Sequence, residues 1–401
     1  MTERRGTPLV GNRFLWPFVL ITSLFFVWGM ARAILDVLNK HVQETLSVSK
    51  GESALLQVTV YGAYFLMALP AGWFIRSRGT RTGVVVGLLL FAAGAFLFVP
   101  SGWGSTFYGL LLPLFVIGCG LVMLEVAANP YAAALGDPLT AAGRLNRAQS
   151  FNGLGSIVGA LAGGLFFFTE TAGPASRNVA VPYVVLGAFV LLVALCFVRL
   201  RLPEVVVERD LRGPEDCGGR IAPTFYFGLF ALFCYEVSEI TINTFFINFV
   251  SDSGYVSPLH ASLLLSFGGL GLFMAGRFAG SALMRRVAAE RLLAVCAVGA
   301  LVCMACVMAG DGWLSVGALV ACYVFESIMF PTVFALSLGY AGERRALASS
   351  LLMLSVVGGA VGPLLTGHLA DAFGLTTAFA VPMVGFAVVL FFAMFSLERG
   401  R

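Results

Sequence analysis

The chain has 401 residues, of which 59% are hydrophobic and 11% are charged, and its formal net charge at pH 7 is +4. Soluble domains carry about 25% charged residues, so this chain has too little polar surface for a water-soluble globular protein. The composition therefore predicts an integral membrane protein, and it argues against nucleic-acid binding because no basic patch is concentrated on a soluble domain.

Apolar runs of about 20 residues recur with short breaks along the chain, and a helix of that length crosses a hydrocarbon core about 30 Å thick. Barrel strands would need only about ten residues each, so helices are the predicted element. The predicted spans are residues 14–37, 53–75, 82–100, 104–129, 147–168, 180–199, 222–250, 258–284, 291–309, 313–338, 346–369 and 375–396. We therefore expect an all-α membrane protein with twelve transmembrane helices.

Basic residues are distributed unevenly between the two sides of these spans. Twenty of the 25 Lys and Arg residues fall in the segments on the side of the two termini. Three fall on the opposite side, namely Lys40, Lys50 and Arg177, and Arg32 and Arg277 lie within spans. Because cytoplasmic segments are enriched in Lys and Arg, both termini are predicted to be cytoplasmic.

An internal repeat appears at an offset of 201 residues, which is typical of secondary transporters. The segment "LEVAANPYAAALG" (124–136) lies over "FESIMFPTVFALSLG" (325–339), so that Glu125 meets Glu326 and Pro130 meets Pro331. The repeat predicts two pseudo-symmetric six-helix bundles.

A charged segment rich in Pro and Gly separates the two copies of the repeat and is predicted to be a solvated linker. The expected organisation is an N-terminal bundle at 1–199, a cytoplasmic linker at 200–221 and a C-terminal bundle at 222–401.

Glycines recur every fourth residue in two of the predicted spans. They are Gly155, Gly159 and Gly163 in one span, and Gly358 and Gly362 in the other. Small residues at this spacing let membrane helices approach closely, so these stripes are predicted to be helix packing faces.

Charged side chains within the spans are the candidates for chemistry, because each costs about 2.5–3.5 kcal/mol at the bilayer centre. They are Arg32, Asp36, Glu125, Glu236, Glu239, Arg277 and Glu326. Arg32 and Asp36 are four residues apart on one helical face, a spacing that would let them form an ion pair of structural role only. A cluster of buried carboxylates beside an arginine is also suited to binding and releasing a proton.

Other protein classes lack their signatures here. A nucleotide-driven pump would need a phosphate-binding loop of the Gly-x4-Gly-Lys-Ser/Thr type, and a zinc peptidase would need His-Glu-x-x-His; the sequence has neither. Cys303 and Cys306 have the spacing of half a zinc site, but a second pair is missing. We expect no enzyme, no catalytic residue, no metal and no cofactor.

Several motifs carry a family resemblance. The segments "LEVAANPY" (124–131), "RLNRAQSFNGLG" (144–155), "LLQVTVYGAYF" (55–65) and "ESIMFPTVFALSL" (326–338) resemble the fucose:proton symporter family of the major facilitator superfamily. That family includes fucose, glucose/galactose and N-acetylglucosamine permeases. The resemblance spans the chain from about Phe25 to Phe373. It implies a monomeric, bacterial inner-membrane sugar importer that works by alternating access.

The resemblance also implies roles for individual residues. An Asp in the first span and a Glu in the fourth are concerned with proton coupling and sugar binding in the family, and they match Asp36 and Glu125. The predicted substrate-binding residues are Gln57, Tyr61, Glu125, Asn129, Asn146, Gln149, Asn152, Glu239 and Asn243. Three of these amides, at 146, 149 and 152, share one helical face by their spacing and suit sugar hydroxyls because amides both donate and accept hydrogen bonds. Asn129-Pro130 is expected to end or kink its helix.

The segment "YEVSEITINTFFINF" (235–249) resembles the glucose/galactose branch of the family, in which a Glu matches Glu239. Glu236 and Glu326 stand where the family has uncharged residues. Glu236, Glu239 and Glu326 are candidates for a second coupling cluster. Like charges at close range cannot all stay ionised, so we expect at least one of the three to be protonated at neutral pH. The alternative is a balancing cation or arginine, and Arg277 is the nearest candidate in the sequence.

The coupling ion is expected to be a proton, and sodium remains an alternative because oxygen-rich clusters bind hard cations. Two further alternatives are an N-acetylglucosamine permease and a sugar sensor that does not transport. A multidrug exporter would be expected to have a more aromatic site with fewer amides.

Overall fold

The computed structural model describes residues 15–99, 106–135, 141–169, 179–199, 221–252, 254, 256–284, 286–310, 312–341, 348 and 351–399. In the N-terminal half the long helices are α1 (Leu15–Leu46), α3 (Leu55–Arg78), α4 (Thr80–Phe96), α5 (Leu111–Ala134), α6 (Ala141–Phe168) and α8 (Ala180–Arg199). Two short elements join them, α2 (Lys50–Ser53) and the 3₁₀ turn η2 (Tyr108–Leu110).

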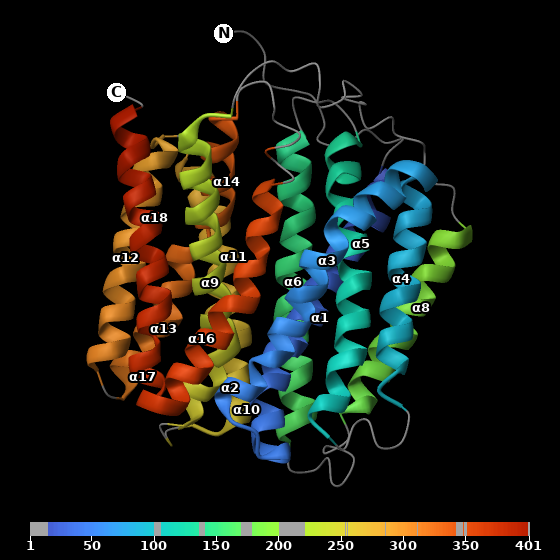
Figure 1. The fold of residues 1–401 in the computed structure, drawn as a ribbon, viewed down its shortest axis with the longest axis horizontal. Coiled ribbons are helices and arrows are strands. Elements are labelled where there is room, and N and C mark those ends of the chain that lie inside the picture. The colour runs from blue at the N-terminus through green and yellow to red at the C-terminus, as the bar shows by residue number, and fades with distance from the viewer. Residues whose placement is uncertain are drawn as a thin grey trace.

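The C-terminal half repeats this arrangement and lies beside the first half (Figure 1). Its long helices are α9 (Pro223–Asp252), α11 (Gly271–Leu283), α12 (Ala289–Ala309), α13 (Trp313–Glu326), α14 (Met329–Gly339), α16 (Gly358–Phe373) and α18 (Ala380–Arg399). Its short elements are α10 (Pro258–Leu263), the π-helical segment η5 (Leu264–Leu270), the 3₁₀ turn η6 (Leu354–Val357) and α17 (Leu375–Ala378).

Among the described residues, eleven helical segments are long and apolar enough to cross a membrane. Helix α4, with 17 residues, is the shorter twelfth. The predicted all-α fold of twelve transmembrane helices in two bundles is therefore confirmed. Apart from residue 221, the predicted linker lies outside the described residues, so the predicted domain boundaries stay a prediction.

Three helices differ from the predicted spans. Helix α1 runs to Leu46, nine residues beyond the predicted end at residue 37, and places Lys40 inside the helix instead of in a loop. The predicted single span at 313–338 is two helices, interrupted at Ser327 and Ile328. Helix α5 continues past Pro130 to Ala134, so Asn129-Pro130 does not end it, and the alternative, that it kinks the helix, stays a prediction. The helix can continue because proline removes only one backbone donor, a loss that membrane helices tolerate near an end.

Glycine contacts hold α1 against α6. A Cβ atom added at Gly155 or Gly159 of α6 would overlap the carbonyl oxygen of Phe26 or Met30 of α1. In the reverse direction, a Cβ added at Gly29 of α1 would overlap the carbonyl oxygen of Asn152. The two backbones therefore touch directly, as the predicted glycine stripe requires.

The same contact recurs in the other half, between α9 and α16. A Cβ atom at Gly358 would lie 2.6 Å from the carbonyl oxygen of Phe233, and one at Gly362 would overlap that of Val237. The glycine stripe is thus reproduced in the pseudo-symmetric helix pair, and each half is a rigidly packed bundle in its own right.

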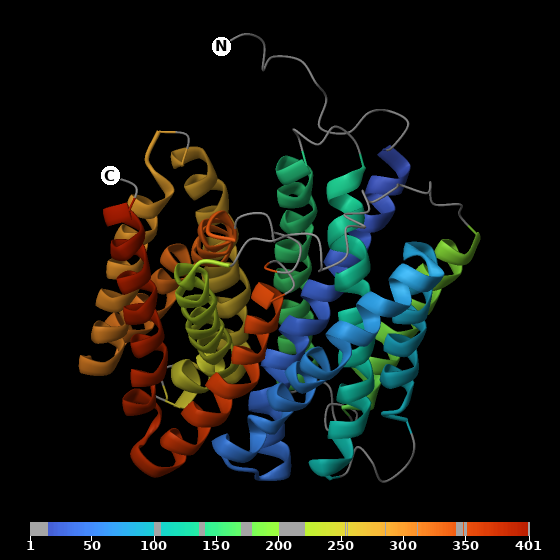
Figure 2. The ribbon, with the colours of Figure 1, turned by 45° about the horizontal axis from the view of Figure 1, so that its top comes forward.

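The two halves pack against each other at the end of the bundle that carries α2 and α10, here called the α2 end (Figures 1 and 2). Helix α1 contacts α9, α2 and α3 contact α16, and α6 contacts α10 and η5. A small apolar cluster of Tyr61, Ile240 and Ala360 joins α3 to α9 and α16.

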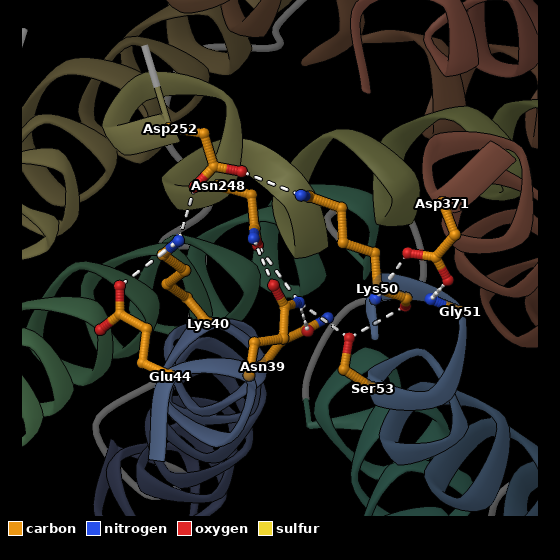
Figure 3. A network of polar contacts seen from close by, with 10 residues as sticks. Asn39, Lys40, Glu44, Lys50, Gly51, Ser53, Asn248, Asp252 and Asp371 are labelled. Atoms are coloured by element: carbon orange, nitrogen blue, oxygen red, sulfur yellow. Dashed lines mark hydrogen bonds and ion pairs between the residues drawn. The ribbon is translucent and has the colours of Figure 1, made fainter. Parts of the chain in front are cut away.

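A polar latch, formed by Lys40, Gln43, Lys50, Asn248, Asp252 and Asp371, closes the α2 end (Figure 3). The Asp252 carboxylate of α9 forms ion pairs with Lys40 Nζ at 2.6 Å and with Lys50 Nζ at 3.0 Å. Asp371 of α16 accepts the backbone N–H groups of Lys50 at 2.9 Å and Gly51 at 2.8 Å.

The latch also contains a pair of amides, in which Asn248 Nδ2 donates to Gln43 Oε1 at 2.5 Å. These contacts explain why α1 continues to Leu46, because its polar last turns are covered by the other half.

The glycine contact generates a stability prediction. We expect Gly155→Ala to destabilise the protein by about 1–3 kcal/mol, because the added methyl group overpacks the α1–α6 contact. Thermal unfolding in detergent measures the change. Gly62→Ala is the matched control: nothing lies within 4 Å of a Cβ there, and alanine is the better helix former by about 1 kcal/mol. A Gly155→Ala protein as stable as Gly62→Ala would contradict the close contact.

The latch generates a conformational prediction. Asp252→Asn removes the anion shared by Lys40 and Lys50, so we expect the α2 end to separate more often. Because Asp252 is partly exposed, the effect is about 1 kcal/mol, or about fivefold in the equilibrium. Spin labels at Thr45 and Ala372 in a cysteine-free background report the distance between the halves.

Glu44→Gln is the control for the latch. Glu44 also binds Lys40, at 3.3 Å, but both residues lie on α1, so this ion pair does not join the halves. The distance distribution of Glu44→Gln should match that of the unsubstituted protein. Equal effects of the two substitutions would show that the latch does not depend on contacts between the halves.

Candidate functional site

An ion pair joins the two halves near the middle of α1 and α9. Arg32 Nη2 of α1 lies 3.2 Å from Glu239 Oε1 of α9, and the Glu239 side chain is only 10% exposed. The ion pair between Arg32 and Asp36 that their spacing would allow is not formed, although the two groups remain within electrostatic range. The long Arg32 side chain reaches across to the other half, where Glu239 has no other cation within ion-pair distance among the described residues.

Asp36 makes a different contact, with α3. Gln57 Nε2 donates a hydrogen bond to Asp36 Oδ1 at 2.9 Å, and both side chains are buried. Thr244 of α9 also lies close to the Asp36 carboxylate. The predicted residues Asp36 and Gln57 thus meet where α1, α3 and α9 come together.

Carboxylates outnumber guanidinium groups at this place, even though Arg277 also lies within electrostatic range of Glu236. Asp36, Glu236 and Glu239 all lie within electrostatic range of Arg32, and so does Glu125 of α5. Glu125 and Glu236 also interact with each other across the two halves. Since one arginine balances one carboxylate, the remaining acidic charge needs protons or another cation.

The surroundings of Glu125 are polar. Its side chain is partly buried and neighbours the hydroxyl group of Tyr64 on α3. That hydroxyl has no hydrogen-bond partner of normal geometry, but it lies close enough to the Glu125 carboxylate to interact with it. Tyr64 lies one helical turn beyond the predicted residue Tyr61 on α3, and the centres of the two rings are 5.8 Å apart. The Tyr61 ring itself packs on Gly359 of α16.

The predicted amide residues have different environments. Asn129 of α5 and Asn152 of α6 are partly buried, and Asn129 Oδ1 and Asn152 Nδ2 have no hydrogen-bond partner. Gln149 is partly exposed on the same helix. Asn243 is buried and accepts a hydrogen bond of 2.8 Å from the hydroxyl group of Tyr323, within the C-terminal half. The side chain of Asn146 lies outside the described residues.

The predicted second cluster is only partly assembled. Glu236 and Glu239 lie together on α9, and Glu326 is within electrostatic range of Glu239. Arg277 of α11 does not supply the balancing ion pair. Its Nε donates to the carbonyl oxygen of Ser327 at 3.1 Å, and its guanidinium lies 4.6 Å from the centre of the Phe273 ring. The arginine that pairs with an acidic residue of this cluster is Arg32, through Glu239.

The sequence interpretation missed the latch residues Gln43, Asn248, Asp252 and Asp371. One signal was available, because Lys40, Gln43 and Glu44 continue a helical pattern beyond the predicted end of the first span. Within the described ranges, no group of three or more His, Cys, Asp or Glu side chains is placed to share a metal ion. The candidate site is therefore the acidic contact around Arg32, together with the unpartnered amide and hydroxyl groups beside it.

Comparisons with known proteins agree with this architecture. The sequence matches the profile of the Major Facilitator Superfamily over residues 21–355 and 228–401. It is 34% identical over 382 residues to a glucose/galactose transporter of Brucella abortus, covering 93% of this chain and 92% of that protein. It is 32% identical over 420 residues to an L-fucose-proton symporter of Haemophilus influenzae, covering 94% of this chain and 96% of that protein.

Solved structures show the same fold. The crystal structure of the transporter FucP in its outward conformation is similar with a TM-score of 0.71 and 28% identity, covering 96% of this chain and 99% of that chain. A D-xylose-proton symporter shares the fold alone, with a TM-score of 0.77 at 11% identity and coverage of 95% and 96%. The chain therefore belongs to the major facilitator superfamily, a family of membrane transporters and not of enzymes, and within it to the group of the glucose/galactose transporters and L-fucose-proton symporters.

Proposed function

We propose that this chain imports a monosaccharide of the hexose, fucose or glucose/galactose type by proton symport. The central site would be exposed alternately to the two sides of the membrane. The observation that carries the proposal is the acidic surplus between the halves. Asp36, Glu125, Glu236 and Glu239 lie within electrostatic range of Arg32, and they outnumber Arg32 and Arg277 together. A site whose charge is unbalanced without an added cation links the movement of the halves to cation binding.

A proton is the cation that this arrangement favours. The carboxylates are almost enclosed by the helices, and a proton needs no coordination shell of several oxygen ligands. Two of the relatives are named L-fucose-proton symporters, which supports the same coupling here. We assign the coupling to Asp36 and Glu125, in the N-terminal half, where the family resemblance places it.

The polar groups beside the carboxylates suit a sugar. Gln57 Oε1, Tyr64 Oη, Asn129 Oδ1 and Asn152 Nδ2 are enclosed and without a hydrogen-bond partner. They include both donors and acceptors, and unpaired buried polar groups gain free energy from a ligand that pairs them. Sugar hydroxyls, which donate and accept at every position, meet that requirement. The names of the relatives point to the same substrate class.

The packing at the α2 end suggests the conformation. Since most basic residues lie in the segments on the side of the two termini, we assign that side to the cytoplasm of a bacterial inner membrane. The latch would then close the outer side, and the structure would represent an inward-facing state of a monomer.

Three alternatives remain distinguishable by experiment. A sodium-coupled symporter would use the same acidic surplus with a different cation. An N-acetylglucosamine permease would prefer the acetylated amino sugar over neutral hexoses. A sensor would bind sugar but fail to exchange labelled for unlabelled sugar across the membrane.

Proteoliposome uptake tests the proposed function. We expect an inward proton gradient without sodium to drive accumulation of labelled sugar, because protons then bind the carboxylates on the outer side and leave on the inner side. A protonophore should abolish the accumulation while leaving counterflow intact. The panel of sugars includes fucose, glucose, galactose and N-acetylglucosamine. Accumulation driven by sodium at symmetric pH, and lost in Glu239→Gln, would replace the proton assignment with a sodium site in the C-terminal half.

The role of Asp36 is tested separately. We expect Asp36→Asn to abolish proton-driven accumulation and to retain sugar counterflow. The asparagine oxygen can still accept the hydrogen bond from Gln57, so the packing is preserved while the titrating group is removed. Glu398→Gln, at an exposed position of α18, is the control and should accumulate sugar normally. Uphill uptake by Asp36→Asn at the rate of the control would remove Asp36 from the coupling mechanism.

A further inference from the structure

Glu326 is a buried acidic side chain without any partner. It is the last residue of α13 and is 0% exposed, and neither of its carboxylate oxygens has a hydrogen-bond partner. Glu239 differs, because it is held by Arg32 at 3.2 Å. Glu326 therefore lacks what a buried anion normally has, namely a cation or several hydrogen-bond donors.

The helix interruption at Ser327 and Ile328 does not use the Glu326 carboxyl group. The backbone acceptors there are bound by other side chains. The Tyr235 hydroxyl donates to the carbonyl oxygen of Glu326 at 3.1 Å, and Arg277 Nε donates to that of Ser327 at 3.1 Å. Ser327 Oγ donates to the carbonyl oxygen of Val324 at 2.7 Å. Because the broken helix is stabilised without it, the carboxyl group does not serve as a helix cap.

Charged and titratable groups approach Glu326 from five helices. They are Arg32 of α1, Tyr235 and Glu239 of α9, Arg277 of α11, Cys303 of α12, and Cys322 and Tyr323 of its own α13. The two arginines are engaged elsewhere: Arg32 pairs with Glu239, and Arg277 binds the Ser327 carbonyl. Glu239, which lies within electrostatic range, would repel an ionised Glu326. None of these groups hydrogen-bonds to the Glu326 carboxylate oxygens. Burying a carboxylate anion without a hydrogen-bond donor or a paired cation is unfavourable, whereas burying the neutral acid costs less.

The pseudo-symmetric equivalent of Glu326 does not share its complete burial. Glu125 occupies the equivalent position in the other half, 201 residues earlier, and is only partly buried beside Tyr64. The two glutamates at equivalent positions therefore have different surroundings. Glu125 lies where the halves meet, and Glu326 is fully buried within the C-terminal half.

We propose that Glu326 is a proton-binding site that retains its proton, so that the group acts as a neutral carboxylic acid beside Glu239. It is a positioning residue. Its O–H can donate a hydrogen bond to the Glu239 carboxylate when the halves part and Arg32 withdraws, and no proton is transferred. This role rests on the proposed transport function, whereas the retained proton is a property of the folded protein alone.

Infrared spectroscopy tests the retained proton without any transport. A protonated carboxyl group has a C=O stretching band that is separate from the bands of carboxylates. At alkaline pH, where an exposed glutamate is ionised, the difference between unsubstituted protein and Glu326→Gln should contain one protonated carboxyl band. The corresponding difference for Glu398→Gln should contain none. Absence of the band from the Glu326→Gln difference would overturn the proposal, whether or not the transporter is proton-coupled.

Transport distinguishes a retained proton from a transported one. Glutamine is neutral, similar in shape to glutamic acid and able to donate a hydrogen bond. We therefore expect Glu326→Gln to keep the proton-to-sugar ratio and to transport within about twofold of the unsubstituted rate, whereas Glu326→Met, which has no donor, should transport about tenfold more slowly. A lower proton-to-sugar ratio in Glu326→Gln would show that this proton moves and would overturn the proposal. If Glu326→Met does not fold, the Glu326→Gln results still decide.

Discussion

The ion pair between Arg32 and Glu239 is the interaction on which the rest of the site depends. It joins α1 to α9, and therefore one half of the molecule to the other, at a place where acidic side chains outnumber basic ones. Burying charges is unfavourable unless they are paired. A change in the position of Arg32 or in the number of bound cations therefore alters the free energy of closing the halves. In the proposed function, this dependence is what couples an ion gradient to sugar movement.

The contacts within each half differ in kind from the contacts between the halves. Inside a half, helices meet backbone to backbone through glycines, as α1 meets α6 at Gly155 and Gly159. Such contacts depend on the close approach of two backbones and involve no charged side chain. Between the halves at the α2 end, the contacts include ion pairs, such as Asp252 with Lys40, and hydrogen bonds between amide side chains, such as Asn248 with Gln43. Water can satisfy these groups when they separate, so the halves are suited to parting as rigid bodies.

The pseudo-symmetry of the fold does not extend to its chemistry. Glu125 and Glu326 are equivalent in sequence, yet the first faces the other half and the second is enclosed without a partner. The broken helix at Ser327 has no counterpart at the equivalent place in α5, which runs unbroken from Leu111 to Ala134. The two halves therefore supply the same scaffold and different side-chain environments. The C-terminal half carries the two acidic residues, Glu236 and Glu326, that depart from the family resemblance.

The sequence by itself determined the membrane class, the twelve helices, the two-bundle repeat and the glycine packing faces. These follow from local properties: run length, hydrophobicity and the spacing of small residues along one helix. It also identified the acidic residues of the site, because a charge within an apolar span is conspicuous.

Only the tertiary structure decided which side chains these charged residues bind. The spacing along α1 would let Arg32 pair with Asp36, but Arg32 reaches Glu239. Arg277 binds a backbone carbonyl instead of a carboxylate. The end of α1 was placed too early for the same reason, since Lys40 is stabilised inside the helix by Asp252, 212 residues away. The free energy of an ion pair depends on the distance between side chains of different helices, and the residue spacing along one helix does not specify that distance.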